Sequence, residues 1–272
     1  MNTAPLPAAV REIRRIVPTA HGQVHVRRHG RPDDAIPLVL LHMSPRSSEM
    51  WARLQRALAR TTIAPDRLGY GFSDAPSREL SMAEYAAATL DALDGLGVRG
   101  RFDVLGMHTG ALEAIELAHL APARVRHLGM IAIPVFDAAE RERGLGSFAQ
   151  MKVTPAEDGS HLVKAWQGRF AFRHPPWDLV DIQRRLVDYL LAPWPGQAYT
   201  AVFGYDAGAR LASLGRPVVA FAPRDDVYEQ TLRSRALLPA GSTYVDLPDF
   251  DIEMLRVRVA EFAQLVGTHL PG

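Results

Sequence analysis

Short apolar runs alternate with stretches of helical periodicity along most of this chain. Continuous apolar runs of about four to eight residues are typical of strands buried on both faces, and they predict strands at 36–42, 61–65, 102–106, 128–133, 217–221 and 243–247. Helical spacing predicts helices at 48–60, 81–96, 111–118 and 252–266, with a further one ending near 238. Charged segments at 12–17 and 23–28 predict a hairpin at the sheet edge. This alternation predicts an α/β fold with a mostly parallel, doubly wound sheet.

The alternation stops between about Phe136 and Arg210, where helical segments rich in aromatic residues take over. About half of the aromatic residues of the chain lie in this segment. Such rings must be buried, either in a small core between the helices or in a cover over the strand ends that lines a pocket. We therefore expect a core made of residues 1–136 and 211–272, with a helical cap inserted at 137–210.

Composition narrows the classes of function. With 272 residues, 47% of them hydrophobic, the chain is long enough for one α/β domain with an inserted subdomain. A net charge of +1 argues against nucleic acid as a partner, because phosphate binding needs a concentrated basic face. The absence of cysteine excludes a thiolate nucleophile and a cysteine-based metal site. No segment is typical of a signal peptide or a membrane span, so we expect a cytoplasmic protein with no membrane partner.

Residues 102–111 join a strand to a helix through a tight turn. Gly106, His108 and Gly110 form a G-x-H-x-G sequence at the spacing of the G-x-S-x-G nucleophile elbow. The glycines remove side chains where the turn has no room for a Cβ, and the central residue projects above the sheet. The helix N-terminus points toward His108, which favours a bound anion and disfavours a protonated imidazole.

Two further motifs follow predicted strands. Residues 42–48 read H-M-S-P-R-S-S and resemble the turn H-G-x-P-x-S-S, and residues 66–74 resemble the loop D-x-x-G-x-G-x-S. Together with residues 106–110, they make the chain similar to the α/β-hydrolase superfamily over nearly its whole length. The helical insertion makes the capped branch most similar, which includes haloalkane dehalogenases, epoxide hydrolases and ring-cleavage product hydrolases.

The resemblance implies that backbone N–H groups of Ser44 and Thr109 form an oxyanion hole. Met43 replaces a glycine of the family motif, and we expect its side chain to narrow the entrance. The other candidates for contact with a substrate are Met107, Arg46 and Trp166.

The resemblance also implies a catalytic acid after the strand at 217–221. Asp225 has the family's position, with Asp226 and Asp137 as alternatives. The family's histidine would follow the strand at 243–247, where this chain has D-F-D at 249–251. Because a serine hydroxyl needs an adjacent base, the serine-esterase mechanism is not carried over.

Three functions of His108 stay open. Its imidazole can act as general base or nucleophile in hydrolysis of an ester, amide or activated carbonyl, oriented by Asp225, because its ordinary pKa is close to 7. It can instead move a proton in a lyase-type or decarboxylase-type reaction. Finally, the chain can be a ligand-binding protein that has lost its chemistry.

Several other polar residues are further candidates for catalysis or substrate binding. His161 would be a second acid/base group if the cap brings it to His108, although residues 158–160 also read as an ordinary turn and helix cap. Arg46 and Arg67 can bind a substrate carboxylate, but surface ion pairs are the commoner role of arginine. We expect His42 and the loop at 66–74 to be structural. We expect no cofactor and no metal, a small molecule as partner, and leave a homodimer open.

Overall fold

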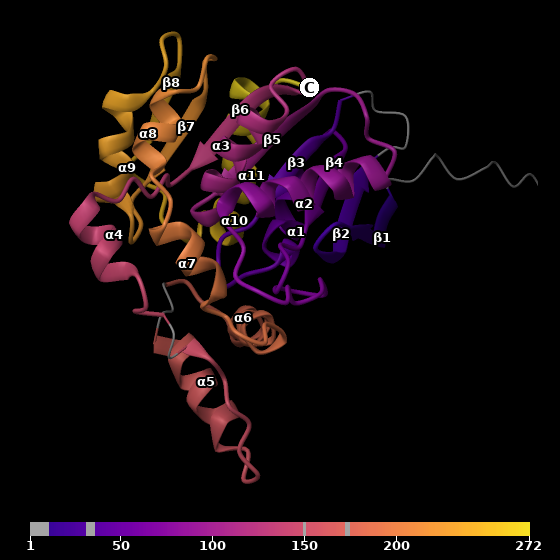
Figure 1. The fold of residues 1–272 in the computed structure, drawn as a ribbon, viewed down its shortest axis with the longest axis vertical. Coiled ribbons are helices and arrows are strands. Elements are labelled where there is room, and N and C mark those ends of the chain that lie inside the picture. Colours follow the sequence, from indigo (N-terminus) through magenta and orange to yellow (C-terminus); the bar gives the residue numbers. More distant parts are fainter. Residues whose placement is uncertain (1–10, 31–35, 149–150, 172–174) are drawn as a thin grey trace, which may run out of the picture.

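The computed structural model describes residues 11–30, 36–148, 151–171 and 175–272. They form an eight-stranded sheet in the order β1-β2-β4-β3-β5-β6-β7-β8 (Figure 1). The pairs β1–β2 and β2–β4 are antiparallel, and all pairs from β4 across to β8 are parallel. The predicted fold class is therefore confirmed. The strands are β1 (Arg11–Thr19), β2 (Gly22–Gly30), β3 (Leu38–Leu41), β4 (Thr62–Pro65), β5 (Phe102–Met107), β6 (Val125–Ile131), β7 (Val219–Pro223) and β8 (Thr243–Leu247).

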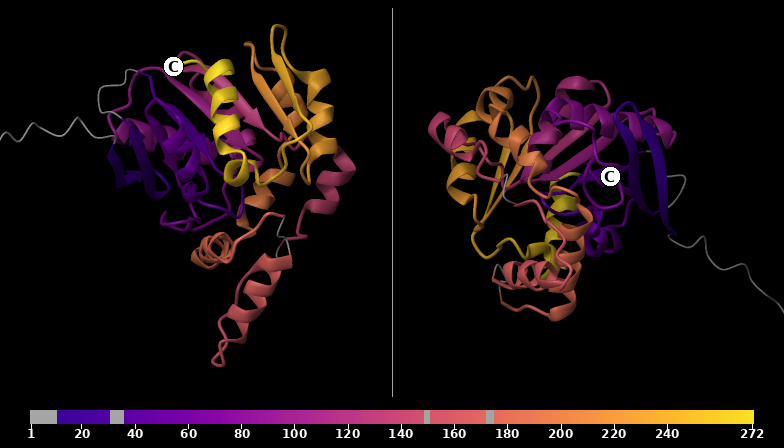
Figure 2. Two further views of the ribbon diagram at one scale, coloured as in Figure 1. Left: turned by 180° about the vertical axis from the view of Figure 1, so that it is seen from behind. Right: turned by 60° about the horizontal axis from the view of Figure 1, so that its bottom comes forward.

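Helices cover both faces of this sheet (Figure 2). One layer contains α2 (Met82–Gly95) and α3 (Thr109–Leu120), and the other contains α1 (Ala52–Ala57), α10 (Met254–Val257) and α11 (Val259–His269). Successive residues of β3 divide between the two layers, because side chains of a strand alternate in direction. Val39 and Leu41 pack with the α2 and α3 side, whereas Leu38 and Leu40 pack with the α1 and α11 side. Burial on both faces explains why the strands read as continuous apolar runs.

Two predicted helices are interrupted. The helix predicted at 48–60 is a 3₁₀ turn, η1 (Ser48–Trp51), followed by α1, which ends because Leu58 adopts an extended conformation. The last predicted helix is divided into α10 and α11 at Arg258. The helix cap at Ser81 is confirmed by a reciprocal capping box with Glu84.

Between β6 and β7 the described residues form helices in place of strands. Figures 1 and 2 show α5 projecting away from the sheet, and none of its residues is buried. Nearer the sheet, aromatic rings do pack together: Phe148 stacks on Tyr199 at 4.0 Å between ring centroids, and Phe136 lies 4.9 Å from Phe203. The helices of this segment are α4 (Ala138–Gly144), α5 (Ser160–Ala171), α6 (Leu179–Leu191), α7 (Gln197–Phe203) and α8 (Ala207–Ala212), and α9 (Tyr228–Ser234) and η3 (Arg235–Leu237) follow β7.

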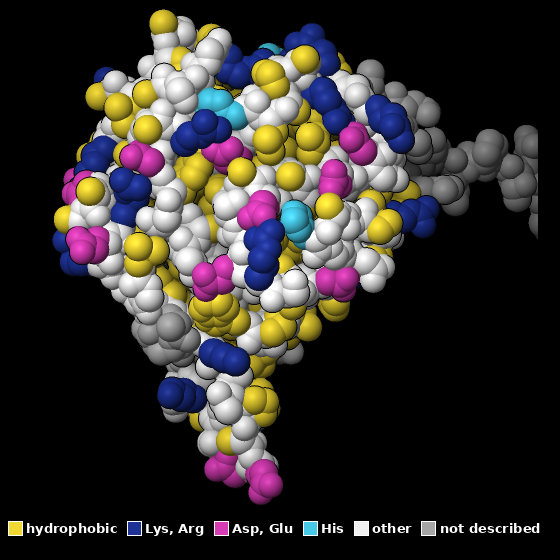
Figure 3. Space-filling view, in the orientation of Figure 1, with side chains coloured by type: hydrophobic (Ala, Val, Ile, Leu, Met, Phe, Trp, Pro, Cys, Tyr) yellow, Lys and Arg dark blue, Asp and Glu magenta, His cyan; other side chains and the backbone are white. Residues whose placement is uncertain are grey.

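The surface mixes charges of both signs. On the face shown in Figure 3, basic and acidic side chains are interspersed, and no broad area carries one sign alone. Among the described residues, no helix combines the length and the apolar character needed to cross a membrane.

Candidate active site

His108 occupies a strained turn between β5 and α3. Its φ of 50° and ψ of −115° are uncommon for a residue with a side chain. A Cβ on Gly106 would lie 2.0 Å from the carbonyl oxygen of Gly110, and a Cβ on Gly110 would lie 2.1 Å from that of Leu41. Neither position therefore has room for a side chain, and the two glycines allow the turn that carries His108.

The imidazole of His108 is held by a buried carboxylate. Its Nε2 lies 2.8 Å from Oδ2 of Asp225, a residue that follows β7 and whose side chain is fully buried. The Asp225 side chain is itself fixed, because Oδ1 accepts a hydrogen bond from the backbone N–H of Val227 at 3.1 Å. Oδ1 of Asp226 lies 3.9 Å from the same Nε2, and this residue is largely exposed. Of the three candidate acids, Asp225 thus makes the hydrogen bond.

The third candidate acid, Asp137, serves another purpose. Its side chain caps α4 by accepting a hydrogen bond from the backbone N–H of Glu140, and Glu140 returns the contact. The structure does not bring Asp137 to His108.

The charge state of His108 reflects two opposing influences. Burial disfavours the imidazolium and lowers its pKa, while the hydrogen bond to Asp225 and the charges of Asp225 and Asp226 raise it. The net result is a raised pKa for His108. The position at a helix N-terminus was expected to disfavour protonation, whereas the carboxylates of Asp225 and Asp226 raise the pKa of His108 in spite of its burial.

The turn after β3 is built around His42 and Arg67. His42 donates from Nδ1 to the carbonyl oxygen of Met43 and accepts at Nε2 from the backbone N–H of Arg67, both at 2.8 Å. Arg67 was expected to bind a substrate carboxylate or to form a surface ion pair, but it is buried and ion-paired with Glu113 at 2.8 Å. Its guanidinium also donates to Oγ of Ser44 at 3.2 Å. This network fixes the backbone on which Ser44 is carried.

The loop after β4 is also structural, in agreement with the prediction. One carboxylate oxygen of Asp66 accepts from the backbone N–H of Ser48, and the other contacts Nδ1 of His25 and accepts from the N–H of Phe72. A Cβ on Gly71 would lie 2.1 Å from this carboxylate, so the turn requires glycine there.

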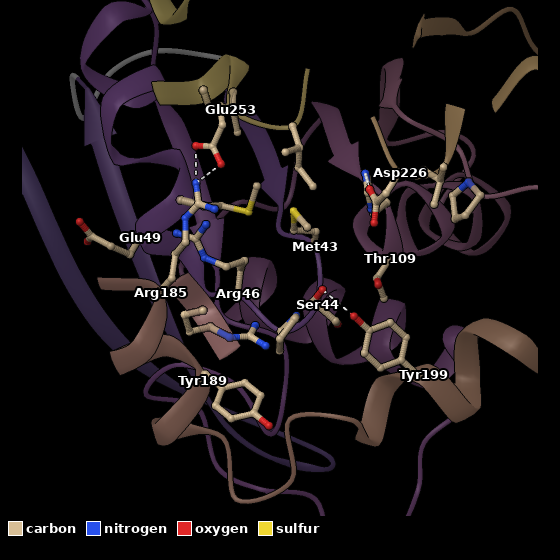
Figure 4. A pocket seen from close by; sticks show the side chains of 18 of the residues that line it. Met43, Ser44, Arg46, Glu49, Thr109, Arg185, Tyr189, Tyr199, Asp226 and Glu253 are labelled. Atoms are coloured by element: carbon tan, nitrogen blue, oxygen red, sulfur yellow. Dashed lines mark hydrogen bonds and ion pairs between the residues drawn. The ribbon is translucent and has the colours of Figure 1, made fainter. Parts of the chain in front are cut away.

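A cavity of about 730 Å³ lies where these turns meet the helical segment. Its wall includes five of the predicted substrate or catalytic residues, Met43, Ser44, Arg46, His108 and Thr109, together with Asp226. Figure 4 shows Thr109 and Asp226 on one side of this space and Arg46 and Arg185 on the other, with Met43 and Ser44 between them.

Asp225 and three other predicted residues lie outside the cavity wall. Met107 is fully buried in the core below the site. Trp166 stacks on Phe170 within α5, and His161, at the outer end of α5, accepts a hydrogen bond from the backbone N–H of Ala156. The structure does not bring His161 to His108, because α5 extends away from the sheet and does not fold over the strand ends.

Other residues of the site were missed from the sequence. Tyr199 donates a hydrogen bond from its hydroxyl to the carbonyl oxygen of Ser44 at 3.0 Å (Figure 4), and it lines the cavity with Phe148 and Phe203. In the loop after β8, Ile252 and Glu253 reach the cavity wall. The aromatic richness of the segment gave a general signal, but no spacing identified these positions.

One cluster has the chemistry of a metal site. Among the described residues, His108, Asp225 and Asp226 each place one potential ligand atom within 4.8 Å of the others. Imidazole and carboxylate ligands suit a divalent transition metal. The short contact between His108 and Asp225 is equally that of a hydrogen-bonded pair.

Comparison with known proteins defines the family. Residues 36–180, more than half of the chain, match the family model described as alpha/beta hydrolase fold, so the chain belongs to this family. The predicted resemblance to the superfamily is thereby confirmed.

Individual proteins agree with this assignment. A 2-hydroxymuconate semialdehyde hydrolase of Pseudomonas putida is 32% identical over 100 residues, covering 35% of this chain and 35% of the relative. A haloalkane dehalogenase of Agrobacterium fabrum is 33% identical over 115 residues, covering 40% and 36%. The chain thus spans about a third of the length of these relatives. In fold, it is similar to the crystal structure of a hydrolase from Pseudomonas aeruginosa, with a TM-score of 0.78, 23% identity and coverage of 95% and 98%.

Proposed function

We propose that this protein hydrolyses an ester, amide or activated carbonyl bond of a small, partly apolar substrate, with His108 as base or nucleophile. The observation that carries the proposal is the 2.8 Å contact between His108 and the buried Asp225 beside the cavity. Membership of the family supports it, as do the hydrolytic names of the similar proteins.

Asp225 determines which nitrogen of His108 is reactive. A carboxylate accepts hydrogen bonds, so Nε2 carries the proton that Asp225 binds, and the lone pair of the neutral ring is on Nδ1. No hydrogen bond joins Nδ1 to a described residue. Nδ1 is therefore the atom that takes a proton from water or attacks the substrate directly.

In the water-mediated form, Nδ1 takes a proton from a water molecule as its oxygen attacks the substrate carbonyl. The carbonyl π bond opens to an oxyanion, and Asp225 stabilises the imidazolium that forms. The tetrahedral intermediate then expels the leaving group, which receives the proton from Nδ1. The products are the acid and the alcohol or amine, and the enzyme returns to its starting state.

We assign the oxyanion to two backbone donors. Thr109 begins α3, and its N–H has no acceptor within the helix. Ser44 lines the same cavity, on a turn that contacts Arg67 and Tyr199 (Figure 4). Donors fixed in advance at the developing charge stabilise it at little cost in reorganisation.

The helical segment 137–210 completes this proposal as a cap. Phe148, Tyr199 and Phe203 stack on one another and contribute apolar surface to the cavity wall that also contains His108. A cavity of about 730 Å³ with such a wall suits a small and partly apolar molecule.

A panel of p-nitrophenyl esters, thioesters and lactones tests the proposal. We expect turnover of at least one member, and His108→Gln should lower kcat/KM by about 10²–10⁴-fold, the usual contribution of a positioned proton-transfer group. Reaction in ¹⁸O-labelled water should place one label in the acid product.

Other outcomes identify the alternatives. Consumption of a substrate without incorporation of ¹⁸O indicates a lyase. Ligands that raise the Tm while no substrate is consumed indicate a binding protein. Activity that is lost on dialysis against a chelator and restored by a divalent ion indicates a metal at His108, Asp225 and Asp226.

A further inference from the structure

Arginine is concentrated at the end of the cavity remote from His108. Figure 4 shows Arg46 and Arg185 on the side opposite Thr109 and Asp226. Arg53 and Arg256 line the same cavity, and lysine is absent from its wall as far as the structure describes it. Guanidinium groups are suited to binding planar anions through two parallel hydrogen bonds.

Arg46 is oriented by one acid and retains donors for another. Its Nε donates to Oδ2 of the buried Asp188 at 2.8 Å, and Asp188 also accepts from Oγ of Ser47 at 2.5 Å. No described residue accepts a hydrogen bond from the two terminal amino groups of Arg46. Because Arg46 lines the cavity, these groups are available to a ligand, and Asp188 holds the guanidinium in place for it.

Three neighbouring arginines contact the same two carboxylates, Asp181 and Glu253. Arg53 donates to both oxygens of Asp181 at 3.1 Å, and Arg256 donates to Glu253 at 2.9 Å. Arg185 also binds Glu253. The Arg53 side chain is 38% exposed, the other four are mostly buried, and in this group of five the arginines outnumber the carboxylates.

A further arginine lies close to this group. Burial lowers the pKa of the Arg169 guanidinium, and the charges of Arg185 and Arg46 lower it further. Arg169 lines the same cavity as Arg46 and Arg185, and like charges in one cavity wall repel one another. An anion bound among them would relieve this repulsion.

We propose that the substrate carries an anionic carboxylate or phosphate group, which Arg46 binds at this end of the cavity while the bond to be cleaved lies at His108. This inference rests on the proposed hydrolase function for the position of the cleaved bond. The charge excess and the orientation of Arg46 by Asp188 do not depend on that function.

The binding test compares ligands of matched length on the wild-type protein. Titration calorimetry with hexanoate, hexyl phosphate and hexanamide should show tighter binding of at least one anion than of the amide, by about tenfold or more, the size expected for charge-assisted hydrogen bonds. The difference should shrink as salt is raised. The stronger of the two anions identifies carboxylate or phosphate, and equal binding of all three ligands overturns the proposal.

Substitutions of arginine test whether the anionic ligand binds at Arg46. Arg46→Gln should remove the preference for the anion, whereas Arg99→Gln, which removes the same charge from an exposed position outside the cavity, should retain it. Arg46→Gln leaves Asp188 buried without its ion pair, so the double variant Arg46→Gln, Asp188→Asn removes both charges together if the single variant does not fold. An anion preference that survives in a folded Arg46 variant overturns the assignment to Arg46.

A kinetic comparison separates this inference from the proposed function. The p-nitrophenyl half-ester of adipic acid should have a lower KM than its neutral methyl ester, and Arg46→Gln should raise only the KM of the half-ester. If neither ester is cleaved but hexanoate binds preferentially, the hydrolase function fails and the anion site stands. If both esters are cleaved with equal KM, the anion site fails and the function stands.

Discussion

Two buried histidines end adjacent parallel strands of this protein and have opposite protonation behaviour. His42 follows β3 and is 1% exposed, and His108 follows β5 and is 8% exposed. Burial together with the charge of Arg67 lowers the pKa of His42 to about 3, whereas Asp225 and Asp226 raise the pKa of His108 in spite of its burial. The sign of the neighbouring charges, more than the depth of burial, distinguishes the two sites.

Their hydrogen bonds show the same contrast. Both ring nitrogens of His42 are occupied by backbone groups, so this neutral ring supports the turn and takes no part in proton transfer near pH 7. His108 has one nitrogen bound to Asp225 and the other facing no described partner. A histidine is suited to chemistry when one nitrogen is fixed and the other remains available.

The largest expected effect comes from removing Asp225, the acid that binds His108. In Asp225→Asn, an amide N–H facing Nε2 would place the ring proton on Nδ1 and block the proposed base, so kcat/KM should fall by about 10²–10⁴-fold, as for the loss of His108 itself. Without the carboxylate, burial dominates, and the pKa of His108 should fall.

The dependence of kcat/KM on pH measures this change in the pKa of His108. In the wild type, activity should rise with pH as the imidazolium loses its proton, with a midpoint above the ordinary histidine value of about 6.5. In Asp225→Asn, the midpoint of the residual activity should move to lower pH. A midpoint that does not move would contradict the assignment of this titration to His108.

The next largest effect concerns Arg67, which contacts His42, and it is an effect on the stability of the fold. Arg67→Met leaves the carboxylate of Glu113 buried without its partner, which should reduce the free energy of unfolding by about 3–5 kcal/mol. Urea denaturation measures the loss. The double variant Arg67→Met, Glu113→Leu removes both charges and should recover much of the stability, and a double variant as unstable as the single one would show that the ion pair is not the cause.

The sequence was sufficient to predict the turn of His108 and its contact with Asp225, because local motifs specify both. Glycines at 106 and 110 identify the turn of His108, and the carboxyl ends of the parallel strands meet at one edge of the sheet, which brings Asp225, after β7, to His108, after β5. For Arg67, only a substrate carboxylate or a surface ion pair was considered, because its partner Glu113 lies on a helix distant in sequence and no local spacing joins them.

The helical segment was harder to interpret for the same physical reason. Aromatic richness predicts burial of rings, yet it does not specify the angle at which each helix leaves the sheet. Helix α5 extends away from the sheet, and His161 and Trp166 lie on this helix. By contrast, Tyr199 on α7 donates a hydrogen bond to the carbonyl oxygen of Ser44. The positions of these side chains depend on tertiary packing, which the sequence pattern does not encode locally.

A smaller effect is expected from His42 itself. In His42→Gln, the flexible amide cannot replace both ring hydrogen bonds in the same geometry, so the free energy of unfolding should fall by about 1–3 kcal/mol. Denaturation in urea tests this. The midpoint of the pH profile should not change, because the pKa of His42 lies well below the range in which the enzyme is assayed. A changed midpoint would make His42 part of the proton-transfer machinery.

The smallest effect is expected from Asp226, whose carboxylate lies 3.9 Å from Nε2 of His108 but is 71% exposed. Its charge raises the pKa of His108, so Asp226→Asn should move the activity midpoint to lower pH in the same direction as Asp225→Asn, but by less, because solvent screens the interaction. Raising the salt concentration should reduce the difference between Asp226→Asn and the wild type, while the effect of Asp225→Asn should persist because that carboxylate is fully buried. If the two variants respond equally to salt, direct hydrogen bonding by Asp225 does not account for the raised pKa of His108, and the distinction between the two acids is wrong.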